Sequence, residues 1–368
     1  MKRRTFVKNS IYGVGFLNLP VAFGGQDSSA FQQQKIKIGQ IGVCHEHASA
    51  RMDTLKKMSD VFEIVGVVDD RNSTAARFSG NNLKSFEGLK WMSEEELLNY
   101  PGMQAVMVET ANSDLVTTSI RCMNRGLAIA MDKPGGEDLA LFQQLINGCK
   151  TRNLPFQMGY MFRGNPAIQF CQRAVREGWL GDVFEMRGTM SHNYGGEGYQ
   201  RYLSNFHGGI MFNLGCHIID LIVSMLGRPE KVTSFLGATK SAADSAYNNC
   251  LAVMEYAHAK AWVHACDSEF RGQRYLKISG TKGTIELSPL ERFDGKSLEL
   301  DLRLRDGNAQ YTSGNHVVTF DAQDDRYIGQ LAEFAKVIKG EIANPYTFEH
   351  DLLVHQVHLA ASGNLPWS

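Results

Sequence analysis

Short apolar runs alternate with longer amphipathic stretches along residues 35–157. The apolar runs are continuous, which is typical of parallel strands buried on both faces of a sheet. One amphipathic stretch opens with a capping box, in which Ser93 is the N-cap and Glu96 is the third helical residue. Strands are expected in KIKIGQIG, FEIVGVVDD, MQAVMVET, LAIAMDKP and PFQMGYMFR, with helices between them. These repeated β-α units predict a doubly wound α/β domain with a parallel sheet.

The pattern changes near residue 158, where strands begin to follow one another without intervening helices. Residues 194–209 are rich in glycine and tyrosine and are expected to form a loop, which leads into a helix at 213–227. Further β-type runs are expected at 231–240, 249–269 and 274–289. Consecutive strands joined by short turns predict an α+β domain with a largely antiparallel open sheet. We therefore expect one domain at 35–157 and a second at 158–368.

The first residues do not share this pattern. The segment KRRTFVK, with Arg3 and Arg4 ahead of an apolar stretch, is typical of a twin-arginine export signal. The apolar stretch at 11–23 is too short and too interrupted to span a bilayer. We expect residues 1–30 to be the export signal and linker of a periplasmic protein, and a disordered basic tail is the alternative.

The composition is that of an ordinary globular protein, with 43% hydrophobic and 21% charged residues. The net charge of −1 gives no electrostatic reason to expect nucleic acid or an anionic membrane surface as a partner. The seven cysteines are scattered singly, so their spacing predicts neither a disulfide framework nor a zinc site. A small molecule is therefore the expected partner.

The loop after the first strand follows a dinucleotide-binding pattern in part. Gly39 and Gly42 are present, but Cys44 and His47 take the second and third glycine places of G-x-G-x-x-G. A helix N-terminus still offers main-chain N–H groups to a pyrophosphate. We interpret this as a Rossmann domain that binds NAD. Contacts to the cofactor are expected from Gly39, Gly42, Val43, Cys44, His45 and His47.

An acidic residue ends the second predicted strand. Asp69 is placed to accept hydrogen bonds from the adenosine ribose and to repel a 2′-phosphate, which favours NAD over NADP; the alternative is that it caps the following turn. For His45 and His47 we rank contact with phosphate or substrate first, and helix capping second. A metal site ranks third, because no carboxylate cluster accompanies the two histidines at suitable spacing, and no metal is expected.

Three further motifs carry a family resemblance: MDKPGG at 131–136, GYMFRGNPA at 159–167 and GGIMFNLGCHIIDL at 208–221. With this domain order, the chain resembles the Gfo/Idh/MocA oxidoreductases over residues 36–365. The resemblance implies that Lys133, in a motif that is usually Glu-Lys-Pro, reaches nicotinamide and substrate. An ammonium at that place stabilises an alkoxide as hydride leaves its carbon. Cofactor contacts are also expected from Thr110, Asn112, Asp132 and Lys133.

The resemblance also implies that His217 is the general base. Asn213 and His217 are four residues apart on a predicted helix and share one face. The family usually has Asp at the first position, and an amide orients an imidazole without stabilising its charged form. Three hypotheses stay open: His217 acts with a lowered pKa, Asp220 assists it, or His192 or His207 shares the proton transfer.

Donors and aromatic faces suited to a polyol or sugar are expected on the substrate side, although a loosened surface loop is equally consistent with part of this segment. The substrate residues expected are Arg163, His192, Tyr194, Tyr202, His207, Asn213 and His217. We predict an NAD-dependent oxidoreductase for a secondary hydroxyl of a sugar or glycoside, with oxidation at C3 as first choice. The alternatives are an NAD-dependent glycosidase and a non-catalytic sugar-binding protein.

Two expectations concern the assembled protein. Because a periplasmic protein meets no soluble nicotinamide pool, NAD is expected to be tightly bound. One face of the second sheet is expected to be uncovered, which favours a homo-oligomer, either a dimer or a tetramer.

Overall fold

The computed structural model describes residues 34–72, 83–194 and 196–367. The predicted export signal and linker at 1–30 lies outside the described residues. The described chain from Lys35 onward forms one compact unit that is built around two sheets.

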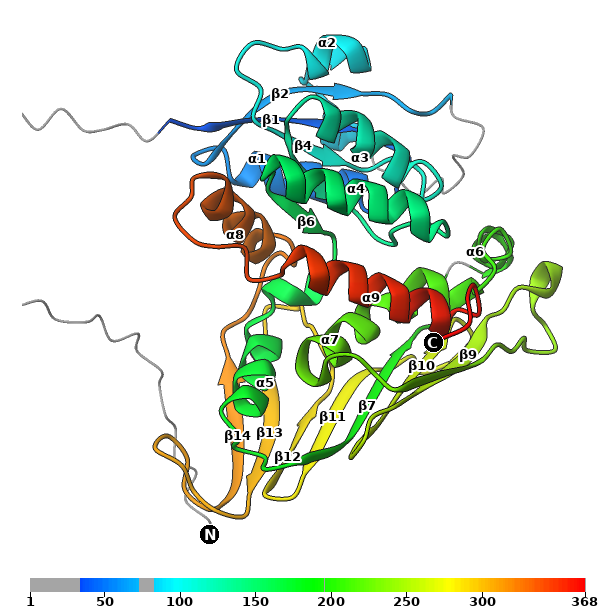
Figure 1. Ribbon diagram of the computed structural model, residues 1–368, viewed down its shortest axis with the longest axis vertical. Helices are drawn as coiled ribbons and strands as arrows, with labels where there is room; N and C mark the ends of the chain where they lie inside the picture. Colours follow the sequence, from blue (N-terminus) through cyan, green and yellow to red (C-terminus); the bar gives the residue numbers. More distant parts are fainter. Residues whose placement is uncertain (1–33, 73–82, 195, 368) are drawn as a thin grey trace, which may run out of the picture. The chain divides into compact units, whose positions relative to one another are not determined.

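The first sheet has six parallel strands in the order β3-β2-β1-β4-β5-β6 (Figure 1). The strands are β1 (Ile36–Ile41), β2 (Phe62–Val68), β3 (Trp91–Met92), β4 (Ala105–Val108), β5 (Ala128–Met131) and β6 (Phe156–Met158). The helices between them are α1 (Ala48–Lys57), α2 (Glu94–Leu98), α3 (Leu115–Asn124) and α4 (Leu139–Arg152). Helix α2 begins with the predicted capping box of Ser93 and Glu96. The order reverses between β1 and β4, and doubly wound sheets bind ligands at such a point.

Helices cover both faces of this sheet. Residues of α3 and α4 pack against one face, and α1 packs against the other. Helix α8 (Ile328–Ile338) joins α1 there through Leu331 and Phe334, although it belongs to the predicted second domain in sequence. Residues of α8 thus contribute to the core beside the first sheet although they come late in the sequence. The domain boundaries at 157 and 158 stay a prediction.

The second sheet has eight strands in the order β14-β13-β12-β11-β7-β10-β9-β8, antiparallel except for the parallel pair β7 and β10. The strands are β7 (Val183–Ser191), β8 (Lys231–Phe235), β9 (Asn249–Glu255), β10 (Lys260–Cys266), β11 (Arg274–Gly280), β12 (Gly283–Leu287), β13 (Leu298–Leu304) and β14 (Gly314–Phe320). Helices α5 (Pro166–Arg176), α7 (Cys216–Leu226) and α9 (Phe348–Ala361) lie along one face (Figure 1). The predicted fold class is confirmed.

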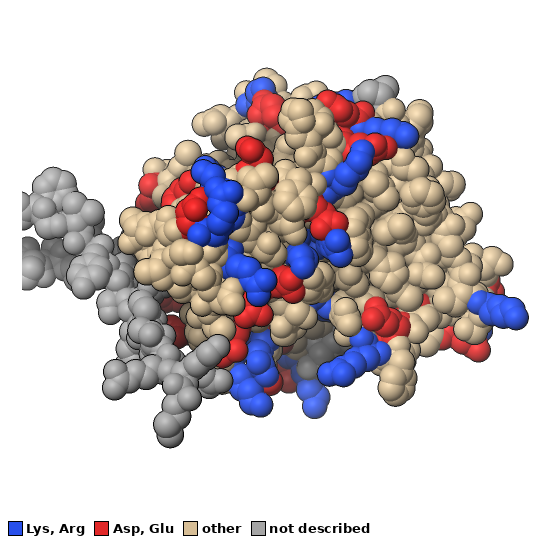
Figure 2. Space-filling model, turned by 90° about the horizontal axis from the view of Figure 1, so that it is seen from below, with Lys and Arg blue, Asp and Glu red and all other residues tan. Residues whose placement is uncertain are grey.

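The opposite face of the second sheet carries charged side chains in pairs. Ion pairs join Arg187 to Glu185 and Lys260 to Glu255 on this face. The view from below in Figure 2 shows acidic and basic side chains intermixed, with uncharged surface between them. In that view, the charged side chains do not form one continuous patch of positive or of negative charge.

Three local predictions are corrected. The expected loop at 194–209 contains a helix, α6 (Gly196–Leu203), because Tyr199 and Leu203 lie four residues apart and are both buried. The runs at 249–269 and 274–289 are hairpins rather than single strands, the first of β9 and β10 and the second of β11 and β12. Strands β13 and β14 were not predicted, although LELDLRL alternates apolar and polar residues as an edge-region strand does.

Two further findings concern the described residues. All seven cysteines are free thiols, and six of them are buried, as expected for small apolar residues. No helix of the described chain is long and apolar enough to cross a membrane.

Candidate functional site

The loop between β1 and α1 needs glycine at one position for a steric reason. Gly42 has φ +100°, and a Cβ there would come within 2.4 Å of the main chain of Glu109. A Cβ on Gly39 would instead meet the flexible side chains of Leu97 and Met103. The tight turn of the loop is therefore set by Gly42, while Cys44 and His47 occupy positions where a side chain is tolerated.

Asp70, not Asp69, faces this loop. Asp70 Oδ1 accepts hydrogen bonds from the N–H groups of Val43 and Cys44, at 2.8 and 3.1 Å. Asp69 is instead bound by the guanidinium of Arg71 two residues later. The assignment of the ribose contact to Asp69 is therefore corrected, because only the next carboxylate turns toward the cofactor loop. Burial, followed by the hydrogen bond and charge of Asp70, raises the pKa of the Cys44 thiol to about 12.

Several buried oxygens near the strand reversal have no hydrogen-bond partner among the described residues. They are Asp70 Oδ2, Thr110 Oγ1 and Asn112 Oδ1. A buried carboxylate oxygen without a donor is costly unless a ligand supplies one, and ribose hydroxyls are such donors. Helix α1 also begins here without a side-chain cap, so its N-terminal dipole favours an anion. These residues fit a dinucleotide with its ribose at Asp70.

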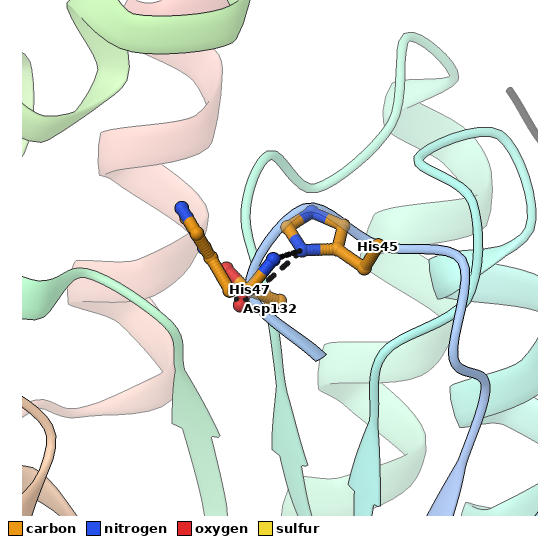
Figure 3. Close-up of side chains that lie close together, drawn as sticks. All are labelled: His45, His47 and Asp132. Carbon is orange, nitrogen blue, oxygen red and sulfur yellow. Dashed lines mark hydrogen bonds and ion pairs between the residues drawn. The ribbon is translucent and has the colours of Figure 1, made fainter. Parts of the chain in front are cut away.

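His45 and His47 converge on Asp132, which follows β5 (Figure 3). His47 Nδ1 lies 3.0 Å from Asp132 Oδ2, and His45 Nδ1 lies 3.5 Å from the same oxygen. His45 Nε2 donates to the main-chain O of Lys133 at 3.1 Å, and Nδ1 accepts from the N–H of His47. Both nitrogens of His45 are thus engaged by the protein. The expectation that His45 reaches phosphate is corrected: its ring ties the loop to β5.

The same group of side chains includes Arg51 and Glu109. Arg51 Nε lies 3.5 Å from Asp132 and 3.6 Å from Glu109. Burial and the charge of Asp132 raise the pKa of Glu109 well above its usual range. Burial would raise the pKa of Asp132 too, but the neighbouring histidines and Arg51 hold it well below. Asp132 is therefore the ionised member of this buried pair.

A carboxylate does accompany the two histidines, so the sequence expectation on that point is wrong. His45, His47 and Asp132 place one ligand atom each within 4.8 Å of one another. The lone pair of His45 Nδ1 is already used by the N–H of His47, and Arg51 already compensates Asp132. The group therefore fits an internally compensated charge cluster better than a cation site.

Lys133 lies beside this cluster and is fully buried. Its Nζ donates to Glu46 Oε1 at 2.9 Å and to the main-chain O of Asn213 at 3.2 Å. Burial lowers the pKa of Lys133, but Glu46, together with Cys216 and Asp132, raises it, and the net shift is upward. Burial likewise opposes ionisation of Glu46, yet Lys133 and His47 lower the pKa of that carboxyl to about 2. The two groups form a buried ion pair.

Asn213 lies in a π-helical turn (Met211–Gly215) that runs directly into α7. Such turns are frequent at functional sites because they re-aim side chains. The Asn213 side chain accepts a hydrogen bond from the hydroxyl of Tyr199 at 2.8 Å. This bond joins α6 to the predicted catalytic helix.

His217 is buried with neither ring nitrogen hydrogen-bonded to a described residue. The rings of Tyr160 and Phe162 meet it edge-on, with centroids 6.1 and 5.7 Å away. Burial, and next the positive charge of Lys133, lower the pKa of His217 well below its usual range. The structure thus brings His217 and Lys133 to one site and keeps the imidazole neutral.

Arg163 and Asp220 are corrected from site residues to structural ones. Arg163 is buried and donates to Asp220 at 2.6 Å and to Asp351 at 2.7 Å. Its guanidinium also lies 3.9 Å from the ring centroid of Tyr346. Because Asp220 is held by this network, it does not assist His217, and Arg163 has its donors turned into the protein.

The remaining predicted substrate residues divide into two groups. His192 is buried, its Nε2 has no hydrogen-bond partner among the residues described, and its ring stacks on Tyr194 at 3.5 Å between ring centroids. Tyr202 accepts a hydrogen bond from Asn112 at 2.7 Å. Glu46 acts electrostatically on His192, Tyr194 and Tyr202, which places them around the ion pair. His207 is exposed instead, and its N–H donates to Glu137.

The sequence interpretation missed several residues of the site. They are Glu46, Asp70, Arg51 and Glu109. Two had a usable signal, because Glu46 lies between two residues already singled out and Asp70 is the second residue of an Asp-Asp pair. The others come from separate elements, and only the tertiary fold brings them to the site.

A doubly wound sheet with a dinucleotide-type loop is typical of NAD(P)-binding oxidoreductases. In this protein the buried Lys133 lies between that sheet and the domain of the second, largely antiparallel sheet. The family model described as "Oxidoreductase family, NAD-binding Rossmann fold" matches residues 36–160. The "GFO/IDH/MocA C-terminal domain" model matches residues 168–286. The chain belongs to the GFO/IDH/MocA oxidoreductase family.

Individual relatives are distant. The chain is 22% identical to bovine (Bos taurus) trans-1,2-dihydrobenzene-1,2-diol dehydrogenase over 53% of its own length and 58% of that protein. It is 26% identical to D-apiose dehydrogenase of Paraburkholderia graminis over 51% of its length and 50% of that protein. The chain therefore spans about half the length of the curated relatives it matches.

A solved structure covers nearly the whole chain. Levoglucosan dehydrogenase in complex with NADH and levoglucosan superposes with a TM-score of 0.72 over 90% of this chain and 98% of that one, at 17% identity. At this identity the likeness shows the fold alone.

Proposed function

We propose that the protein is an NAD-dependent oxidoreductase that acts on a secondary hydroxyl of a sugar or glycoside. The observation that carries the proposal is the juxtaposition of a buried, charged Lys133 with a neutral His217 that has no hydrogen-bond partner among the described residues. A nicotinamide bound at this site supplies the acceptor for the hydride. The chain's own residues then have to stabilise an oxyanion and take up a proton.

Lys133 suits the first task. Its ammonium is buried, so its charge acts through a medium of low dielectric constant and stabilises a developing alkoxide strongly. Because its pKa is raised, Lys133 stays protonated and acts as an electrostatic and hydrogen-bonding group rather than as a base.

His217 suits the second task. Its imidazole is neutral, so a lone pair is free to accept the hydroxyl proton. The amide of Asn213 does not stabilise the resulting imidazolium by charge, so proton uptake by His217 is transient and the proton has to pass onward. His192, with an unpartnered Nε2, is the second imidazole on this side of the site.

NAD is the proposed cofactor, and its tight retention is part of the proposal. The half-buried Asp70 carboxylate, which has one oxygen without a partner among the described residues, favours a ribose with free hydroxyls over one that carries a 2′-phosphate. The match to an NAD-binding family model supports the same choice.

The sugar class of the substrate rests on two supports. Tyrosine hydroxyls and imidazoles surround the ion pair, which suits a ligand with many hydroxyl groups. Among proteins that this chain is similar to, one is named for D-apiose and one was solved with levoglucosan. Oxidation at C3 remains our first choice, because a 3-keto sugar acidifies the neighbouring C–H.

The test begins with mass spectrometry of the purified, denatured protein, which should release NAD(H). A panel of sugars and glycosides is then followed at the reduced-nicotinamide absorbance band. Lys133→Met, which keeps the length of the side chain without its charge, should lower kcat about 100- to 1000-fold. Release of an aglycone without net reduction would favour the glycosidase. Sugar-dependent thermal stabilisation without any turnover, equal in Lys133→Met, would favour a binding protein.

Two proposals concern assembly and location. We propose a homo-oligomer formed through the uncovered face of the second sheet, where Phe235 and Val317 are 54% and 61% exposed. Light scattering after gel filtration tests this, and a monomer would contradict it. We further propose export through residues 1–30, which a reporter fusion with Arg3 and Arg4 replaced by Lys would test.

A further inference from the structure

Glu46 is the only described carboxylate for which a hydrogen bond to Lys133 Nζ is recorded. It comes from the cofactor loop between β1 and α1, whereas the second acceptor of Lys133 is a main-chain oxygen of the π-helical turn. The two contacts reach Nζ from a loop beside the first sheet and from a helical turn of the second domain. Together they fix the direction of the ammonium.

The surroundings of Lys133 make this carboxylate important. Desolvation destabilises a buried ammonium, and Asp132, another carboxylate that acts on Lys133, is also engaged by His47 and Arg51. Asn213 contributes a main-chain oxygen and an uncharged amide. Glu46 is therefore the group that compensates the charge of Lys133.

The other titratable and charged groups that face the pair come from every neighbouring element. Those of the cofactor loop and the ends of β4 and β5 are His45, His47, Glu109 and Asp132. Those of the second sheet and its helices are His192, Tyr194, Tyr199, Tyr202, Cys216, His217 and His358. Among them, Glu46 alone combines a negative charge with a direct bond to Nζ.

We propose that Glu46 is a positioning residue for the oxidoreduction proposed above: it aims the Lys133 ammonium and supplies the negative charge that the amide of Asn213 does not. The inference rests on the proposed function for its catalytic consequence. Its electrostatic content can be measured without turnover.

The test removes the negative charge of Glu46 and then introduces a negative charge at residue 213, the other residue that contacts Lys133 Nζ. In Glu46→Gln, the pKa of Lys133 should fall, because the charge that offsets burial most strongly is removed. In the double variant Glu46→Gln/Asn213→Asp, a carboxylate on the residue that already touches Nζ should raise the pKa again. Lysine labelled with ¹³C at Cε reports the titration by NMR, and Lys133→Met assigns the signal.

The kinetic result should follow the titration. The wild-type kcat should not change with pH in the alkaline range. At neutral pH, kcat of Glu46→Gln should be about tenfold lower than wild type, and it should fall further at alkaline pH as Lys133 loses its proton. The double variant should regain the level alkaline limb. Glu46→Asp separates orientation from charge: Lys133 should stay charged while kcat falls several-fold, because the shorter side chain no longer holds Nζ in place.

Two results would overturn the inference. One is an unchanged Lys133 titration in Glu46→Gln, and the other is a wild-type kcat in Glu46→Asp. If Glu46→Gln does not fold, the Glu46→Asp variant is the test: a lowered kcat supports the inference, and a wild-type kcat overturns it. If the titration shifts as expected but no protein form oxidises any substrate, the proposed function fails while the compensation by Glu46 stands.

Discussion

The two sides of the site treat buried polar groups in opposite ways. On the first sheet, both nitrogens of His45 are hydrogen-bonded, and the neighbouring charges compensate one another. On α7, His217 is buried as deeply, but neither of its nitrogens has a partner among the described residues. Satisfied groups of the first kind hold the structure together, and unsatisfied groups of the second kind are available to a ligand.

Burial without a partner does not by itself define a functional group. His355 on α9 is also buried with both nitrogens unpartnered, yet it packs against Phe142, with ring centroids 4.2 Å apart. What sets His217 apart is that Lys133 acts on it electrostatically. Two kinds of prediction follow. Replacing a buried group whose hydrogen bonds are made should lower stability, and replacing a buried group without a partner near Lys133 should lower activity.

The largest effect is expected from Arg163→Met, which removes a satisfied charge. Asp220 and Asp351 would remain buried without their shared partner, so the free energy of unfolding should fall by about 3–5 kcal/mol. Urea denaturation measures the change. Arg305→Met, which breaks the exposed pair with Asp306, is the matched control and should leave the free energy of unfolding nearly unchanged, because solvent screens that pair. Equal losses in the two variants would contradict the structural role of Arg163.

Acid should destabilise the first region through His45. Burial lowers the pKa of folded His45 to about 4, whereas unfolded histidine titrates near 6.5. Between these values the unfolded chain binds more protons, so stability is complete above about pH 6.5 and declines down to about pH 4. His45 should account for up to about 3 kcal/mol of this decline. Denaturation of His45→Asn at both pH values should show a smaller difference than wild type, and an equal difference would contradict the assignment.

Removing the unsatisfied imidazole should affect catalysis instead. His217→Asn deletes the proton acceptor, so kcat should fall about 100-fold, while no recorded hydrogen bond is lost. His355→Asn is the control, because it removes an equally buried and unpartnered ring outside the site. Steady-state kinetics should show near wild-type kcat for this control. Similar losses in both variants would mean that packing, not proton transfer, explains the effect.

The smallest effect is expected at the cofactor ribose. Asp70→Asn keeps an oxygen for the N–H groups of Val43 and Cys44 but removes the charge, so the Kd for NAD should rise about tenfold. Asp69→Asn, beside Arg71, should leave the Kd unchanged. Calorimetric titration of NAD into cofactor-free protein measures both, and a larger loss in Asp69→Asn would restore the original assignment.

Much of the architecture could be predicted from local sequence. Continuous apolar runs and caps identify the parallel strands and helices, because period and capping are properties of neighbouring residues. The expected loop at 194–209 contains α6 because Tyr199 and Leu203 are buried, and their burial depends on contacts with other segments, such as the bond from Tyr199 to Asn213. The sequence does not separate β9 from β10, because residues 256–259 carry no strong turn signal.

The site was predictable where a motif carries its own chemistry. Lys133 and His217 were identified from short motifs, and the fold does bring them to one site. The assignment of Arg163 failed because its partner Asp351 is 188 residues away, and no local pattern reveals that its donors are turned inward. The choice between Asp69 and Asp70 depends on the direction in which the chain leaves β2.

The sequence by itself thus determined the two sheets, the glycine at the tight turn and the two residues proposed to carry the chemistry. These follow from periodicity, from the steric need at Gly42 and from residue types with few structural uses in a buried strand end or helix. Only the tertiary structure decided which polar groups are satisfied. Glu46 reaches Lys133 across 87 positions, and the His217 ring has no hydrogen-bond partner in the described part of the chain, because hydrogen bonding between distant segments is set by packing and not by neighbours in the chain.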